Sequence, residues 1–216
     1  APRFRDLWLL FYSNELLPEI QSQFAAVTWR LPDDSALITY RGTDLSLTGW
    51  KEDFNMSFQS SVPAQEKALW YLEAFARVHG GPIRLAGHSK GGNLAVYAAA
   101  RCQPEVRKRI EAVHNHDGPG FFAAMLEDPG YREVLPRVRT FVPQSSVVGM
   151  LLEHEEPYSV IRSRQLSLLQ HDPYSWEVLG GDFVRVEEID ANSRFLDTTI
   201  KTWLAQTSLE ERKAIV

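Results

Sequence analysis

The stretch from Pro82 to Arg101 constrains the fold of this chain more than any other part of it. A short apolar run ends at Gly87, and Gly91 and Gly92 open an alanine-rich segment, so that Ser89 stands in the pattern G-x-S-x-G. A serine in a sharp strand-to-helix turn needs neighbours without side chains two positions before and after it. Its hydroxyl is then raised beside the amides of the helix. The pattern predicts a strand, a turn and a helix, with Ser89 as a candidate nucleophile.

An ordinary glycine-rich turn with a solvated serine is the alternative. The flanks favour the first interpretation, because a strand-like run precedes the turn. In addition, Leu94, Ala95 and Ala98 give the following helix a face that suits close packing on a sheet.

Predicted strands and helices alternate through the middle of the chain. The order strand, helix, strand, helix implies right-handed crossovers and a mostly parallel central sheet, and we expect helices on both of its faces. The fold class is therefore α/β, and at 216 residues we expect a single domain, 1–216. The expected strands are Phe24–Leu31 and Ala36–Tyr40 (a hairpin), the run from Ile83, Ile110–His116, Val138–Pro143 and Tyr158–Ile161; the expected helices are Ala64–His79 and Lys90–Arg101.

The two ends of the chain are less regular. Residues 3–20 are apolar and aromatic without one clear period, and we expect one or two helices there. A closing hairpin is expected between residues 176 and 186, and Ser193 is expected to cap a helix. A capping-box pattern begins at Thr207, and the helix that it starts would be cut off at Val216. We therefore expect the chain to be part of a longer protein.

Composition excludes several classes of function. A net charge of −5 argues against nucleic acid as a partner, since nucleic-acid binding needs clustered Lys and Arg. The longest apolar run is far too short for a stable membrane span. The single cysteine, Cys102, excludes an internal disulfide and a multi-thiolate metal site, and it is consistent with a cytoplasmic location. We expect no cofactor and no metal.

A nucleophilic serine needs a base, and the base needs an orienting carboxylate. His154 and His171 are the histidines that lie far enough downstream of Ser89. His154 sits in an acidic run, which is typical of a solvated loop, whereas His171 follows the last predicted core strand and is the better candidate base. Asp117, at the end of the strand after the Ser89 helix, is the candidate acid, although an aspartate before Gly-Pro-Gly is also a common turn former. Asp172 is adjacent to His171 in the chain and points elsewhere if the loop is extended.

Two further patterns carry alternatives. The strand near Tyr40 runs into Gly42-Thr43, which either offers an amide and a hydroxyl to an oxyanion or forms a plain β-turn. His114, His116 and Asp117 share a strand end and suggest a metal hydrolase, but any strand places alternate residues on one face.

Taken together, these stretches resemble the class 3 (fungal-type) lipases, which have the α/β-hydrolase fold. The resemblance is closer to a bacterial branch of that superfamily that has been carried as a domain of unknown function. It covers most of the chain. The matching stretches are R-G-T-D at Arg41–Asp44, G-W-K-E-D-F-N-M at Gly49–Met56, G-H-S-K-G-G-N-L-A at Gly87–Ala95, D-G-P-G-F at Asp117–Phe121, V-P-Q-S-S-V-V-G-M at Val142–Met150 and Q-H-D-P-Y-S-W at Gln170–Trp176.

The resemblance implies roles for particular residues. Ser89 would be the nucleophile and His171 the base, while Thr43 and the amide of Lys90 would form the oxyanion hole. Residues 45–54 occupy the place of the lipase lid. The implied activity is hydrolysis of a carboxylic ester, such as a lipid or lysophospholipid, through an acyl-enzyme. The candidate lining of an acyl pocket is aromatic and comprises Trp50, Phe54, Phe58, Phe121 and Phe122.

The chain departs from the lipase pattern in two places. Class 3 lipases carry the acid after the strand equivalent to Val138–Pro143, where this chain has Gln144-Ser145-Ser146. The acid is therefore Asp117 or absent, and its absence would make the chain a binding or regulatory module without turnover. Lys90 replaces an apolar residue, and we expect a solvated side chain or one that faces an anionic substrate group.

Overall fold

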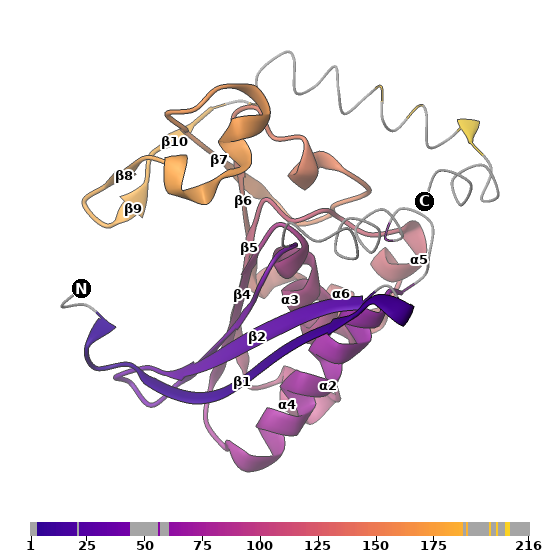
Figure 1. The fold of residues 1–216 in the computed structure, drawn as a ribbon, viewed down its shortest axis with the longest axis vertical. Coiled ribbons are helices and arrows are strands. Elements are labelled where there is room, and N and C mark those ends of the chain that lie inside the picture. Colours follow the sequence, from indigo (N-terminus) through magenta and orange to yellow (C-terminus); the bar gives the residue numbers. More distant parts are fainter. Residues whose placement is uncertain are drawn as a thin grey trace.

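The computed structural model describes residues 4–20, 22–43, 56, 61–187, 189, 199, 202, 206 and 207. Within these residues one eight-stranded sheet has the order β1-β2-β3-β4-β5-β6-β7-β10 (Figure 1). Strands β3 to β7 run parallel, whereas β1, β2 and β10 pair antiparallel at the two sides. The strands are β1 Trp8–Leu17, β2 Ser22–Arg30, β3 Ala36–Tyr40, β4 Ile83–His88, β5 Ile110–His116, β6 Val138–Pro143, β7 Tyr158–Ile161 and β10 Arg185–Val186.

The two long helices, α2 (Pro63–Val78) and α3 (Lys90–Arg101), pack together on one face of this sheet (Figure 1). The side chain of Gln65 caps α2 by accepting from the main-chain amide of Val62 at 3.0 Å. The shorter helices are α4 Pro104–Arg107, α5 Ala123–Leu126 and α6 Pro129–Val134; the 3₁₀ turns are η2 Pro18–Ile20, η3 Leu135–Arg137, η4 Val148–Met150, η5 Ser167–His171 and η6 Pro173–Ser175.

The main core lies between the sheet and these helices. Side chains alternate along β4, so that Ile83 and Leu85 are fully buried against the helices while Arg84 and Ala86 face the other side and are half-buried. The core contains the strand residues of this face together with α2 and α3. Helices therefore cover this face of the sheet, as expected, and the two long described helices, α2 and α3, both lie on it.

The central elements match the sequence predictions closely. The Phe24–Tyr40 hairpin, the helix after Pro63, α3, β5, β6 and β7 are all confirmed. The prediction of helices in residues 3–20 is wrong, because residues 8–17 form β1, which pairs with β2 from Trp8 opposite Arg30 to Leu17 opposite Ser22. No residue of β1 is fully buried. An edge strand without a buried face has no apolar period by which to recognise it.

The closing hairpin is present in a different form. β8 (Val178–Leu179) and β9 (Asp182–Phe183) form a separate two-stranded ribbon, and β10 then joins the main sheet beside β7. The predicted helix from Ser193 and the capping pattern at Thr207 fall mostly on residues outside the described ones. None of the helices in the described ranges is long and apolar enough to cross a membrane.

Candidate active site

Ser89 occupies the sharp turn between β4 and α3. Its backbone has φ 57° and ψ −133°, a left-handed conformation that an L-residue adopts only under strain. A Cβ atom at Gly87 would lie 2.1 Å from the main-chain carbonyl of Gly91, and one at Gly91 would lie 2.2 Å from the main-chain oxygen of Tyr40. Both glycines are therefore needed where the sequence pattern places them.

The end of β3 lies against the same turn. A Cβ atom at Gly42 would be 2.7 Å from the main-chain oxygen of His88 and 3.2 Å from the Cβ atom of Ser89. Thr43 follows directly and is half-buried, and Lys90 begins α3 on the other side of the serine. The two expected oxyanion donors thus flank Ser89. Residues 45–54, the expected lid, lie outside the described residues.

Asp117 is fully buried at the end of β5, with φ 53°. Its Oδ2 lies 2.6 Å from Nδ1 of His171. The other oxygen, Oδ1, accepts from Ser146 Oγ at 2.5 Å and from the main-chain nitrogen of Gly149 at 3.1 Å. The buried carboxylate is thus in contact with three groups that can donate to it, and its contact with Nδ1 fixes the orientation of the imidazole.

His171 is held in a loop by bonds on either side. Its neighbour Gln170 is buried and accepts from the main-chain nitrogen of Ser145 at 2.8 Å through Oε1. Trp176 Nε1 donates to the main-chain oxygen of Gln170 at 2.8 Å. The structure therefore brings His171 and Asp117 together at the edge of the sheet where Ser89 lies. Between these described residues, no hydrogen bond joins Ser89 Oγ to His171; such bonds are often long without substrate.

Comparison with known proteins identifies the family of this chain. The sequence matches the model of the Mbeg1-like family over residues 1–216. The chain belongs to the Mbeg1-like family. No curated protein sequence matches it.

Solved lipase structures resemble this Mbeg1-like chain in fold. They include the native Rhizomucor miehei lipase propeptide complex (TM-score 0.52, 14% identity, 89% of this chain covered) and a deletion mutant of that complex (0.54, 16%, 94%). A third is a triacylglycerol lipase from Penicillium expansum (0.50, 10%, 84% of this chain and 74% of that one). The chain spans about two thirds of the Rhizomucor proteins, 65% and 67%. The fold is the α/β-hydrolase fold.

Two charged residues of this Mbeg1-like chain lie in surroundings that the sequence analysis did not predict. The expectation for Lys90 is wrong, because its side chain is only 1% exposed and its Nζ donates to both the main-chain oxygen and Oε1 of Gln23 at 2.8 Å. His154 is also not solvated: its Nδ1 contacts Oε1 of buried Glu156 at 3.1 Å. Burial alone would raise the pKa of Glu156, but the bond to His154 and the charge of that ring lower it to about 2.

The other candidate residues from the sequence that the structure describes do not contribute to the arrangement of Ser89, Asp117 and His171. Oδ1 of Asp172 accepts from the amide of Tyr174 and caps η6. His116 packs against the rings of Phe141 and Trp176, and burial lowers its pKa to about 4. Across the described part of the chain, no three His, Cys, Asp or Glu side chains are grouped to hold a metal ion. Phe121 is a core residue; Trp50, Phe54 and Phe58 lie outside the described residues.

Sequence reasoning missed the donors around Asp117, the candidate acid. Ser146 belongs to the segment after β6 in which an acid was expected from the resemblance, and it donates to Asp117. Gly149 contributes only its main chain, and a Cβ atom there would lie 2.2 Å from Oδ1 of Asp117. The matching stretch Val142–Met150 was the available signal, but nothing in it distinguishes a donor from a loop residue.

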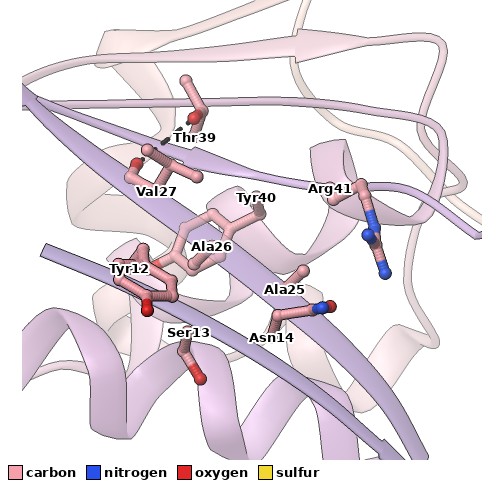
Figure 2. A pocket seen from close by; sticks show the side chains of 9 residues that line it. All are labelled: Tyr12, Ser13, Asn14, Ala25, Ala26, Val27, Thr39, Tyr40 and Arg41. Carbon is pink, nitrogen blue, oxygen red and sulfur yellow. Dashed lines mark hydrogen bonds between the residues drawn. The ribbon is translucent and has the colours of Figure 1, made fainter. Parts of the chain in front are cut away.

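A cavity of about 380 Å³ lies beside β1, β2 and β3 (Figure 2). Figure 2 shows Tyr12 and Asn14 of β1 on one side of it and Arg41, at the end of β3, on the other. Its lining contains neither Ser89, Asp117 nor His171. The cavity is therefore not part of the candidate site.

Proposed function

We propose that this chain is a serine hydrolase that cleaves carboxylic esters, with Ser89 as the nucleophile, His171 as the base and Asp117 as the acid. The observation that supports it most is the 2.6 Å contact between His171 Nδ1 and the buried Asp117 carboxylate, at the edge of the sheet where Ser89 lies. A buried carboxylate aimed at the Nδ1 of a half-exposed imidazole leaves Nε2 as the basic atom.

The residues then act in two steps. Nε2 of His171 takes the proton of Ser89 as Oγ attacks the ester carbonyl, and the main-chain amide of Lys90 together with Thr43 stabilises the oxyanion. When the intermediate collapses, the same imidazole gives its proton to the departing alcohol. A water molecule activated by His171 then hydrolyses the acyl-enzyme and restores Ser89.

The substrate class is an acyl ester, such as a lipid or lysophospholipid. The fold is shared with proteins described as lipases and as a triacylglycerol lipase, which favours acyl esters over other substrates of a serine nucleophile. At 10% to 16% identity this likeness is one of fold, so the chemistry rests on the residues themselves.

The alternative, a module without turnover, rested on the missing carboxylate after Pro143. In the structure Ser146 of that segment bonds to Asp117, and Asp117 reaches His171 from the neighbouring strand β5. The argument for a protein without catalytic turnover is therefore weaker, and we favour an ester hydrolase.

A fluorophosphonate probe tests the proposal directly. We expect the folded wild-type protein to be labelled at Ser89 and Ser89→Ala to show no labelling, with p-nitrophenyl esters of increasing chain length turned over by the wild type alone. Ser159→Ala is a matched control, because this half-buried serine of β7 lies away from the turn. A folded wild type that is neither labelled nor active on any ester contradicts the proposal.

A further inference from the structure

The side chain of His88, the residue before Ser89, contacts the loop that carries His171. Its Nε2 lies 2.7 Å from the main-chain oxygen of His171, and the centres of the two imidazole rings are 4.5 Å apart. A carbonyl oxygen only accepts hydrogen bonds, so Nε2 of His88 carries a proton. The bond joins positions 83 residues apart in the chain.

The strand geometry explains why His88 meets this loop. Side chains alternate along β4, so His88 lies on the same face as Arg84 and Ala86, away from α3. The main chain then turns sharply at Ser89. The C-terminal end of β4 therefore carries the hydroxyl of Ser89 and, from His88, a hydrogen-bond donor to the loop of His171.

Within the described part of the chain, the other bonds given for His171 and its neighbours do not reach β4. Gln170 ties the loop to Ser145 after β6, Trp176 ties it to its own hairpin, and Asp117 holds only the imidazole. The contact of His88 with the main chain of His171 is thus a direct link between the strand that carries Ser89 and the loop that carries the base.

The surroundings of His88 favour its neutral form. Burial lowers its pKa, and the imidazole of His171 lowers it further, while the hydrogen bond to the main chain of His171 and the charges of Asp117 and Asp172 oppose this effect. A neutral ring with its proton on Nε2 donates to the carbonyl and adds no second positive charge beside the imidazole of His171.

We propose that His88 is a positioning residue, which holds the His171 loop so that its imidazole lies within reach of Ser89 Oγ. The inference rests on the proposed function. Acyl transfer depends on sub-ångström placement of the base, and a misplacement of about 1 Å costs on the order of 100-fold in rate. His88 does not touch the substrate in this role.

A matched pair of variants separates the hydrogen bond from the packing. His88→Gln retains a nitrogen donor at about the position of Nε2, whereas His88→Met has the same length and no donor. We expect kcat of His88→Met to fall roughly 10- to 100-fold with little change in KM, and His88→Gln to stay within about 3-fold of wild type. His114→Gln, a half-buried histidine on the neighbouring strand β5, is the control and should leave kcat unchanged.

The imidazole of His171 gives a readout that does not need activity. Its Nδ1 proton, bonded to Asp117, should give a strongly downfield proton NMR signal in wild type and His88→Gln, and a shifted or broadened one in His88→Met. Equal loss in both variants, or a His88→Met protein with wild-type kcat and an unchanged signal, overturns the positioning role. A wild type that shows the signal but no labelling by the fluorophosphonate refutes the proposed function, and the NMR comparison still decides whether His88 positions the loop.

Discussion

Replacing Asp117 by Asn should change which ring nitrogen of His171 carries the proton, while a side chain of nearly the same size remains at position 117. Oδ1 of Asp117 accepts from Ser146 Oγ and from the Gly149 amide, and Oδ2 faces His171 Nδ1. An asparagine has one acceptor oxygen, and two donors already surround the Oδ1 position. Its NH₂ group will therefore face His171.

An NH₂ group at this position needs an acceptor, so Nδ1 of His171 has to lose its proton and Nε2 has to carry it. A protonated Nε2 does not accept the proton of Ser89. We expect kcat to fall by roughly 10³- to 10⁴-fold, the effect of the wrong tautomer in serine hydrolases. At 1.36 kcal/mol for each factor of ten, this loss corresponds to about 4 to 5.4 kcal/mol of transition-state stabilisation.

The assay is the initial rate of p-nitrophenyl ester hydrolysis, together with the rate of fluorophosphonate labelling, for wild type and Asp117→Asn. Asp172→Asn is the matched control, because an asparagine keeps the acceptor for the amide of Tyr174 that caps η6. It should stay within about 3-fold of wild type. An Asp117→Asn protein with more than a tenth of the wild-type rate would refute this account of the acid.

Two predictions concern stability. Lys90→Met removes the buried amino group that donates to both oxygens of Gln23, and it should lower the free energy of unfolding in urea titrations by about 2 to 4 kcal/mol. The control, Lys67→Met, removes a partly exposed ion pair and should lower the free energy of unfolding by less than about 1 kcal/mol. Equal losses in the two variants would contradict the burial argument. The pKa of Glu156 is depressed from 4.5 to about 2, so its contribution, on the order of 3 kcal/mol, is present above pH 4.5 and is lost as the pH falls towards 2. Wild type should therefore lose more stability than Glu156→Gln between pH 6 and pH 3, and parallel losses would count against it.

The elements that the sequence predicted best are those with one buried face. β3 begins and ends where it was predicted, since Ala36, Ile38 and Tyr40 are buried on the same face and alternate with half-buried residues. β1 was missed because most of its apolar side chains are exposed, Trp8 and Tyr12 by more than half. Apolar content without burial has no period, and composition alone does not separate a strand from a helix.

The site was predictable in part for a similar reason. The chain order of Ser89, Asp117 and His171 pointed to three strand ends or loops at one edge of a parallel sheet, where side chains from distant segments meet. Burial of charged groups was not predictable, because an acidic neighbourhood in sequence says little about the neighbours in space. His154 was misplaced on this account, and Lys90 was misplaced because its partner, Gln23, lies 67 residues away in the chain.

The position of the acid has a consequence for how such chains are classified. The residues directly after Pro143 are Gln, Ser and Ser and include no acid, yet the carboxylate of Asp117, which follows another strand, lies 2.6 Å from the imidazole of His171. Whether a chain of this kind has kept an acid beside its histidine is therefore judged better from distances in three dimensions than from one stretch of sequence.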